Sequence, residues 1–377
     1  MRIAFIGQKG IPVSQWGVER HVEEIAKRLA NKGHEVLVYS RETYPKGKGV
    51  LPPGVKVLEL PSIPLKAWDT IVHSFLASID VLFRKVDIIH FQSQGPAIFV
   101  ILPKIFKRSA KVVFTFHCDD VLRPQWGLFA KLALRMGEWI GMKFADEVIS
   151  ASAPVFTDRL VQKYGRKVNT IPNGVFLAQA DCGELRLPEN YILAVSRLIR
   201  SKGLDHLINA FNLISKDYPN CKLLIVGSPT LNDNDKPRLQ ALASGNDHII
   251  FMGHQPSNRL FQIFQNAEVF VQPSEIEGLP MTLLEAASVG IPVIASDIAE
   301  HTSVLKDFGI YFKSKNYIDL AIKLRQVLDN KESLKVKAAE MSQMIAQDYS
   351  WDSVADKVNV IYSGLGSKNK VLKPKLA

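Results

Sequence analysis

Two glutamates, Glu277 and Glu285, stand eight residues apart around the expected start of a helix. Residues 269–271 are apolar and predict a short buried strand, Pro280 suits the first turn of a helix, and Gly290 predicts its end. Glu277 should therefore lie in the strand-to-helix loop, and Glu285 should lie one to two turns into the helix. Carboxylates in these two positions could accept hydrogen bonds from the hydroxyl groups of a sugar or a ribose.

The same loop offers an anion-binding site. The backbone N–H groups of Gly278, Leu279 and the first helical turn have no partner within the helix, and they carry the positive end of its dipole, which suits a diphosphate. Carboxylates beside bound phosphates fit a sugar nucleotide. In the simpler alternative, Glu277 only complements the helix N-terminus and Glu285 is solvated. Against it, Glu285 should be buried, because the other residues at 283–287 are apolar.

Arg197 and Lys202 could supply the positive charge that a diphosphate requires. Arg197 follows an apolar strand expected at residues 191–196, and Lys202 stands just before Gly203 and a helical pattern. Two cations at the carboxyl end of a strand can neutralise a pyrophosphate leaving group without a metal ion. The alternative is that both are ordinary surface charges.

Short apolar strands alternate with helical patterns along the chain, which predicts parallel sheets covered by helices on both faces. Strands are expected at residues 3–6, 35–39, 55–60, 88–91, 112–116, 147–150 and 169–171, and then at 191–196, 223–227, 249–253, 269–272 and 293–296. The helix after the first loop is expected at residues 19–32. The sequence thus predicts an α/β protein of two Rossmann-like, doubly wound domains that face a central cleft.

The expected boundaries follow from these patterns. Residues 1–175 form the N-terminal domain, residues 176–350 the C-terminal domain, residues 351–366 a helix that packs back on the N-terminal domain, and residues 367–377 a mobile basic tail. The three cysteines, Cys118, Cys182 and Cys221, lack metal or disulfide spacing and indicate reduced thiols. With no apparent signal peptide or membrane-spanning segment, we expect a cytoplasmic protein.

Several segments in order resemble family 4 glycosyltransferases of the GT-B fold. They include the two glutamates with the Ala-Ala-Ser-Val-Gly-Ile-Pro-Val that follows, the opening Gly-Gln-Lys-Gly-Ile-Pro at residues 7–12, Phe-Thr-Phe-His at 114–117, Ile-Pro-Asn-Gly-Val at 171–175 and Ser-Arg-Leu-Ile-Arg-Ser-Lys-Gly-Leu at 196–204. The resemblance spans residues 1–365. Within the family, the opening is most similar to a bacterial branch of rhamnosyltransferases that build surface polysaccharides.

This resemblance implies roles for individual residues. It places Glu277 at the sugar hydroxyls, Glu285 at the nucleotide ribose, Arg197 and Lys202 at the diphosphate, and His117 against the donor sugar. It adds Gly17, Gly278, Leu279 and Pro280 as donor-binding positions. It also implies a sugar-nucleotide donor, transfer with retained anomeric configuration, and no cofactor.

Two features depart from this pattern or compete with it. Trp16 occupies a position where many family members have a second glycine beside Gly17, which puts the path of that loop in doubt. Asp233 and Asp235 form an Asp-x-Asp pair, the metal-binding motif of the other glycosyltransferase fold. They lie in a polar loop far in sequence from the phosphate segments, so we expect a solvated turn and no required metal.

The positive charge is concentrated in one half of the chain. Residues 1–175 carry 25 Lys and Arg against 15 Asp and Glu, a net charge of +10, whereas residues 176–377 carry 22 of each. An anionic partner is therefore expected, either a polyprenyl-diphosphate-linked acceptor or an anionic membrane surface. Residues 98–108 and 82–85, which join apolar runs to cations, could contact that membrane, or could be core helices with basic ends. No nucleic-acid-binding module is evident.

The combined interpretation is a retaining, metal-independent glycosyltransferase. It would move a hexosyl or deoxyhexosyl group from a nucleotide diphosphate sugar to a glycan or lipid-linked glycan in surface polysaccharide biosynthesis. Two alternatives stay open, a GT-B sugar-nucleotide epimerase and a non-catalytic protein that binds an anionic polymer or membrane. A phosphorylase is disfavoured, because no framework for a pyridoxal phosphate lysine is evident.

Overall fold

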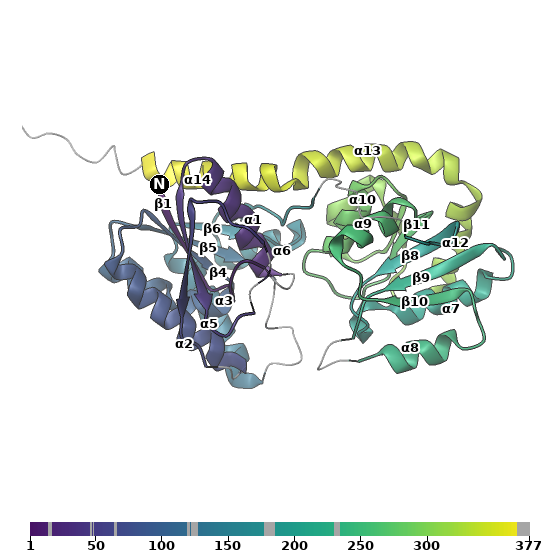
Figure 1. Ribbon diagram of the computed structural model, residues 1–377, viewed down its shortest axis with the longest axis horizontal. Helices are drawn as coiled ribbons and strands as arrows, with labels where there is room; N and C mark the ends of the chain where they lie inside the picture. Colours follow the sequence, from purple (N-terminus) through teal and green to yellow (C-terminus); the bar gives the residue numbers. More distant parts are fainter. Residues whose placement is uncertain are drawn as a thin grey trace, which may run out of the picture. The chain divides into compact units, whose positions relative to one another are not determined.

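The chain forms two compact units, each built on its own parallel sheet (Figure 1). The computed structural model describes residues 1–13, 17–45, 47, 49–63, 66–118, 121, 127–176, 185–229 and 234–367. Unit 1 comprises Met1–Gly174 with Trp351–Ala377, and unit 2 comprises Val175–Ser350. The predicted class of two Rossmann-like parallel-sheet domains is confirmed. The predictions for Trp16, Cys182, Asp233 and residues 368–377 fall outside the described residues.

Unit 1 contains a seven-stranded sheet in the order β3-β2-β1-β4-β5-β6-β7. Its strands are β1 (Arg2–Ile6), β2 (Glu35–Arg41), β3 (Val55–Leu60), β4 (Ile88–Gln92), β5 (Lys111–Phe116), β6 (Glu147–Ser150) and β7 (Asn169–Thr170). Its helices are α1 (Val18–Asn31), α2 (Lys66–Asp80), η1 (Val81–Phe83), α3 (Gln94–Ala97), η2 (Ile98–Val100), α4 (Ile101–Phe106), α5 (Leu128–Phe144), α6 (Pro154–Tyr164) and α14 (Trp351–Ser367).

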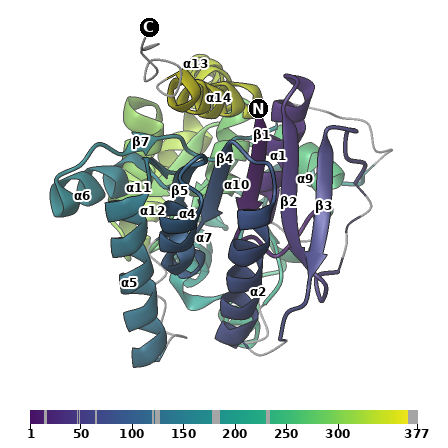
Figure 2. The same ribbon diagram turned by 90° about the vertical axis from the view of Figure 1, so that its left-hand side faces the viewer.

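Two helical layers enclose the unit 1 sheet. Apolar residues of α1 and α14 share one core with β1, β2 and β4. The pairs Arg28–Asp352, at 2.6 Å, and His90–Tyr362, at 2.5 Å, also tie α14 to this unit. Figure 2 shows α2 and α5 as long helices of unit 1 with α4 between them, and these helices contact one another through α3 and η2.

Unit 2 contains a six-stranded sheet in the order β10-β9-β8-β11-β12-β13. Its strands are β8 (Asn190–Val195), β9 (Cys221–Val226), β10 (Ile249–Gly253), β11 (Val269–Gln272), β12 (Val293–Ser296) and β13 (Ile310–Phe312). Its helices are η4 (Arg200–Lys202), α7 (Leu204–Ile214), α8 (Lys236–Ala243), α9 (Ser257–Gln265), α10 (Met281–Ser288), α11 (Ala299–Leu305), η5 (Lys306–Phe308), α12 (Tyr317–Asp329) and α13 (Lys331–Tyr349). Apolar residues of α7, α8 and α12 pack on this sheet in one core.

Both sheets pair all their strands in parallel, and every strand predicted from the sequence is present within one or two residues of its expected bounds. Strand β13 was not predicted. None of the described helices combines the length and apolar composition that crossing a bilayer requires. Cys118 and Cys221 are free thiols.

Candidate functional site

Each sheet reverses its strand order next to its first strand, between β1 and β4 in unit 1 and between β8 and β11 in unit 2. At such a switch point the loops from the two strands leave in opposite directions, and ligands bind outside the carboxyl ends of the strands. In unit 2 the loop after β8 carries Arg197 and Lys202, and the loop after β11 carries Glu277. The topology therefore brings Lys202 and Glu277, which are 75 positions apart in the sequence, together at the carboxyl ends of the strands.

The two loops of unit 2 touch at Gly203. A Cβ atom there would lie 2.2 Å from the carbonyl oxygen of Pro273, and the backbone φ is +62°, so only glycine fits. The backbone N–H of Glu275 also donates to the carbonyl of Ser201 at 2.9 Å. This close approach of the backbones fixes Lys202 beside the loop that bears Glu277.

Glu277 and Lys202 form a nearly buried ion pair, with side chains 9% and 13% exposed. Oε1 of Glu277 accepts three hydrogen bonds, from Lys202 Nζ at 2.6 Å, from Ser274 Oγ at 2.7 Å and from Gln272 Nε2 at 2.8 Å. Thr282 at the start of α10 donates to Gln272 Oε1 at 3.0 Å and fixes that amide. Among the described residues, no donor contacts Oε2 of Glu277, so this oxygen can accept from a ligand.

The surroundings keep Glu277 ionised. Burial by itself raises the pKa of this carboxyl group. The charge and hydrogen bond of Lys202, together with the Ser274 hydroxyl, outweigh burial, and the pKa is lowered from its ordinary value of 4.5. Glu277 is therefore an anion at neutral pH that presents one free oxygen.

The N-terminus of α10 lies directly after this carboxylate. No side chain caps it, Pro280 occupies the N-cap position, and the helix begins at Met281. Sequence reasoning placed Pro280 inside the helix, one residue too early. Because Glu277 bonds to side chains rather than to the first turn, the interpretation that it merely complements the helix end does not describe the structure.

Glu285 lies on α10, one turn after its start, but it is half-buried rather than buried. Its neighbours Leu283, Leu284, Ala286 and Ala287 are buried. The expectation of a buried carboxylate was wrong because α10 also has a less apolar face, on which Thr282, Glu285 and Ser288 are all partly exposed.

Sequence reasoning missed His301, which lies on α11 and is fully buried. Its Nδ1 lies 3.0 Å from both the carbonyl oxygen and the Oγ of Ser296. Since a carbonyl can only accept, Nδ1 carries the proton, and Nε2 is a buried acceptor without a hydrogen-bond partner in the described structure. Burial lowers the pKa of His301, although the charge of Glu277 opposes this shift. The one sequence signal that could have pointed to His301 was the polar Ser296 at the carboxyl end of β12, the strand next to β11.

Arg197 and Asp235, two other charged residues of unit 2 singled out in the sequence, are not part of the Lys202–Glu277 pair. The Arg197 side chain is exposed at the end of β8 and forms no ion pair with a described residue. Asp235 was expected in a solvated turn, but it is buried and binds Arg238 through hydrogen bonds of 2.7 and 2.6 Å, which corrects that expectation. The described residues include no group of three or more His, Cys, Asp or Glu arranged to hold a metal ion.

His117 belongs to unit 1, where it follows β5. Its Nε2 lies 2.7 Å from Gln92 Oε1, and its ring makes an edge contact with His21 at 4.8 Å between centroids. Burial, together with the neighbouring histidines, lowers the pKa of His117 well below 6.5, so its ring is neutral. Because the amide oxygen of Gln92 can only accept, Nε2 carries the single proton of the neutral ring, and Nδ1 can accept a hydrogen bond from a ligand hydroxyl. The ring offers no positive charge to a phosphate.

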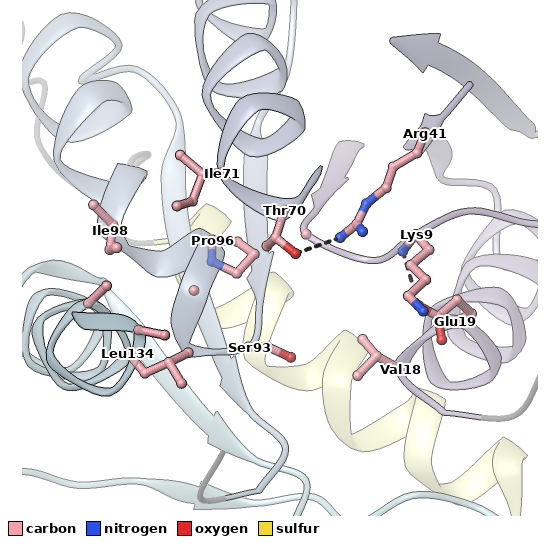
Figure 3. Close-up of a pocket in the computed structure, with 14 residues that line it drawn as sticks. Lys9, Val18, Glu19, Arg41, Thr70, Ile71, Ser93, Pro96, Ile98 and Leu134 are labelled. Carbon is pink, nitrogen blue, oxygen red and sulfur yellow. Dashed lines mark hydrogen bonds between the residues drawn. The ribbon is translucent and has the colours of Figure 1, made fainter. Parts of the chain in front are cut away.

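Gly17 caps the N-terminus of α1 with a φ of +146°, a conformation that side-chain-bearing residues rarely adopt. Glu19 accepts the backbone N–H of Lys9 at 3.0 Å, which ties the loop after β1 to this helix. Lys9 and Glu19 also line a cavity of about 220 Å³ at the switch point of unit 1 (Figure 3).

This cavity has a cationic end and an apolar end. In Figure 3, Arg41 and Lys9 lie on one side, and Ile71, Ile98 and Leu134 lie on the other. The guanidinium of Arg41 is paired with Asp69 and donates to Thr70 Oγ1 at 3.2 Å. The other residues that line the cavity are Gly7, Val18, Glu19, Thr70, Ser93, Gly95, Pro96, Ala130 and Ala133.

Comparison with known proteins identifies both units. Residues 182–362 match the family profile of Glycosyl transferases group 1, and residues 17–179 match that of Glycosyltransferase Family 4. A glycogen synthase of Mycobacterium tuberculosis is 24% identical over 100% of this chain and 98% of its own length. The phosphatidylinositol N-acetylglucosaminyltransferase gpi3 subunit of Schizosaccharomyces pombe is 23% identical over 94% of this chain and 79% of its own.

Solved structures share the fold over nearly the whole chain. Sucrose-phosphate synthase from Thermosynechococcus elongatus superimposes with a TM-score of 0.81 at 21% identity, covering 97% of this chain and 99% of its own. Anabaena HepE in complex with UDP-glucose gives a TM-score of 0.75 at 18% identity, covering 97% and 100%. At these identities the likeness establishes the GT-B fold.

Proposed function

The chain belongs to the family 4 glycosyltransferases of the GT-B fold, and we propose that it transfers a hexosyl or deoxyhexosyl group from a nucleotide diphosphate sugar to a glycan or lipid-linked glycan. The observation that carries this proposal is the nearly buried Lys202–Glu277 pair beside the uncapped N-terminus of α10. The UDP-glucose bound by HepE supports a sugar-nucleotide donor. In this proposal unit 2 binds the nucleotide diphosphate of the donor and unit 1 binds the acceptor.

Glu277 would hold the donor sugar. It is ionised, its Oε1 is fixed by three donors, and Oε2 would accept from sugar hydroxyls. Lys202 has three N–H donors and uses one for Glu277, so the others can reach the diphosphate. The first turn of α10, with Gly278, Leu279 and Pro280 before it, would supply backbone N–H groups and a positive dipole end to the leaving phosphate.

The remaining predicted residues complete this proposal. Arg197, exposed after β8, would bind the diphosphate, and Glu285 would accept from the ribose hydroxyls. His117 would contact the donor sugar as a neutral hydrogen-bonding group, and Gly17 would let the backbone approach the donor. We propose retention of configuration through attack on the face that the phosphate leaves. A role in surface polysaccharide synthesis, in the cytoplasm at the inner face of the membrane, is part of the proposal.

Incubation with labelled sugar nucleotides and a cell-membrane extract tests this function. Transfer of label to a lipid or glycan fraction is the expected result. Formation of an epimeric sugar nucleotide without transfer would contradict it and would favour an epimerase. Binding of the extract without any chemical change in the donor would favour a non-catalytic protein.

Replacing Glu285 with alanine should weaken donor binding by about 1.5 to 3 kcal/mol, the worth of hydrogen bonds to a charged acceptor. Calorimetric titration with a nucleoside diphosphate, which lacks the sugar, isolates this effect. Ser288→Ala, one turn further along α10, is the matched control. Unchanged nucleotide affinity in Glu285→Ala would remove Glu285 from the proposed site.

Transfer should not require a divalent metal ion, because Lys202, Arg197 and the α10 N-terminus can stabilise the leaving diphosphate. We expect the same initial rate with a chelator and with added Mg²⁺ or Mn²⁺. An Asp235→Asn variant should respond to neither addition. Abolition of transfer by the chelator, with recovery on adding metal, would overturn this assignment.

A further inference from the structure

We propose that the outer face of α5 docks unit 1 on an anionic lipid bilayer. Five large apolar side chains of this helix are exposed: Leu128 (82%), Phe129 (89%), Leu132 (65%), Met136 (47%) and Trp139 (47%). At about 100° per residue they fall within an arc of roughly 100°. We refer to these five residues as the α5 stripe.

The opposite face of α5 is firmly anchored, so the exposure of the stripe does not reflect a loosely packed helix. Glu138 is buried and accepts from Gln94 at 2.7 Å, from Lys163 at 2.7 Å and from Tyr164 at 2.6 Å. A Cβ on Gly137 would lie 1.9 Å from the carbonyl oxygen of Gln94, which shows how closely α5 approaches α3. The helix is held in an orientation that presents the stripe to solvent.

Exposed aromatic side chains are concentrated on the same layer of unit 1. Seven described Phe and Trp side chains are strongly exposed, and six of them lie on α2, η1, α4 or α5 (Figure 2): Trp68, Phe75, Phe83, Phe106, Phe129 and Trp139. Single exposed apolar residues are common on proteins, whereas many large ones on one helical layer are typical of an interaction surface. Phe and Trp beside cations are typical of helices that lie in the membrane interface.

Charge selects an anionic bilayer as the occupant. Arg135 and Lys143 lie within about the same arc of α5 as the stripe, and neither forms an ion pair with a described residue. The Lys143 ammonium lies 4.9 Å from the centre of the Trp139 ring. The half of the chain that contains α5 has a net charge of +10. A second copy would oppose these cations with like charge, whereas anionic headgroups attract them, each by about 1 kcal/mol.

The segment at residues 98–108 is a poorer membrane contact than its sequence predicts. Lys104 binds both carboxylate oxygens of Asp146 at 3.0 Å, and Lys107 donates to the carbonyl of Leu82 at 2.9 Å. Reversing these charges would break internal bonds and would not test membrane binding. Only Arg108 of the three cations is exposed.

The stripe also borders the cavity of unit 1. Ala130, Ala133 and Leu134 on the inner side of α5 line the apolar end of that cavity, next in sequence to the exposed Phe129 and Leu132. If unit 1 binds the acceptor, which rests on the proposed function, docking through α5 would bring the cavity to the depth of a lipid-linked headgroup. The surface therefore favours a lipid-linked acceptor over a free glycan.

Vesicle sedimentation of the full chain tests the docking surface. The unmodified chain should sediment with vesicles of phosphatidylcholine and phosphatidylglycerol and much less with phosphatidylcholine alone, and added salt should weaken the binding. Leu132→Glu should lower the partition coefficient roughly tenfold or more, about the factor that burying a leucine side chain supplies. Val360→Glu, at a 70% exposed position on α14, is the matched control and should bind normally.

Several outcomes would overturn the proposal. They are no binding of the unmodified chain to anionic vesicles, equal binding by Leu132→Glu, or a dimer by light scattering that Leu132→Glu dissociates while vesicle binding stays absent. Donor binding, measured on the same preparations, separates this proposal from the proposed function. Normal donor affinity in a chain that does not bind vesicles would contradict only the docking surface. Vesicle binding without donor affinity would contradict only the proposed function.

Discussion

Replacing Lys202 with methionine is expected to lower the turnover number on the order of a hundredfold or more. The variant loses the cation that the proposed function assigns to the leaving diphosphate, and also the group that keeps Glu277 ionised. Without Lys202, burial dominates and the pKa of Glu277 rises. Steady-state transfer rates as a function of pH should therefore show an acid limb at higher pH in the variant than in the unmodified enzyme.

The same variant should also be less stable, and its stability should change with pH in the opposite direction from that of the unmodified chain. In the unmodified chain the lowered pKa of Glu277 contributes stability above its ordinary value of 4.5, and this contribution is lost as the pH falls through the lowered pKa. In Lys202→Met the pKa is raised instead, so the unpaired carboxylate destabilises the fold at neutral pH by roughly 3 to 5 kcal/mol. Thermal unfolding should then show the variant gaining stability as the pH is lowered.

Two further variants separate catalysis from folding. Arg200→Met changes an exposed cation two residues away and should leave turnover near normal. The double variant Lys202→Met with Glu277→Gln removes the unpaired charge, so its melting temperature should recover while its turnover stays low. Full recovery of turnover in that double variant would mean that the pair serves only to stabilise the fold.

The positions of the central strands were predictable because both faces of a parallel sheet are covered there, so these strands are mostly apolar runs. Strands β11 and β12 are fully buried runs of this type. Strand β13 escaped prediction because it has only three residues at the edge of its sheet, and two of them are partly exposed. The burial of Glu285 was predicted wrongly because the composition of α10 conceals its less apolar face.

The ion pair of the candidate site was not predicted, although both of its members were. Lys202 and Glu277 were assigned to different parts of the donor, because spacing along the chain carries no information about a contact 75 residues apart. The doubly wound strand order supplies that information, since β8 and β11 flank the switch point. Gly203 adds the final constraint, because only a residue without a side chain lets the two loops meet.

The cavity of unit 1 follows from the same topology. It opens where β1 and β4 diverge, and its lining includes Gly7 after β1 and Ser93 after β4. Ser93 has a φ of +70°, an uncommon conformation for a residue with a side chain, and such conformations concentrate at functional sites. Sequence reasoning did not single out Arg41 or Ser93, because neither stands in a recognisable motif.

Replacing Glu277 with glutamine is the second change expected to have a large effect, a fall in turnover on the order of a hundredfold. The amide keeps the shape of the side chain but loses the negative charge. The glutamine amide has only one acceptor oxygen. That oxygen can accept from Lys202 and Ser274, or it can accept from the sugar, whereas the carboxylate of Glu277 has an oxygen for each. Affinity for a nucleoside diphosphate without the sugar should change little, because Glu277 is assigned to the sugar.

The matched control for this variant is Glu275→Gln, which removes the same charge two residues earlier. Glu275 binds His206 at 3.3 Å and Lys315 at 3.0 Å, away from the Lys202 ammonium, so its loss should leave turnover within a few-fold of normal. Initial rates and nucleotide affinities of both variants decide the assignment. Equal losses in the two variants would indicate a general effect of negative charge in this loop. A loss confined to Glu277→Gln, with nucleotide affinity retained, would support the assignment of Glu277 to the transferred sugar, because loss of a direct contact with the nucleotide would also weaken nucleotide binding.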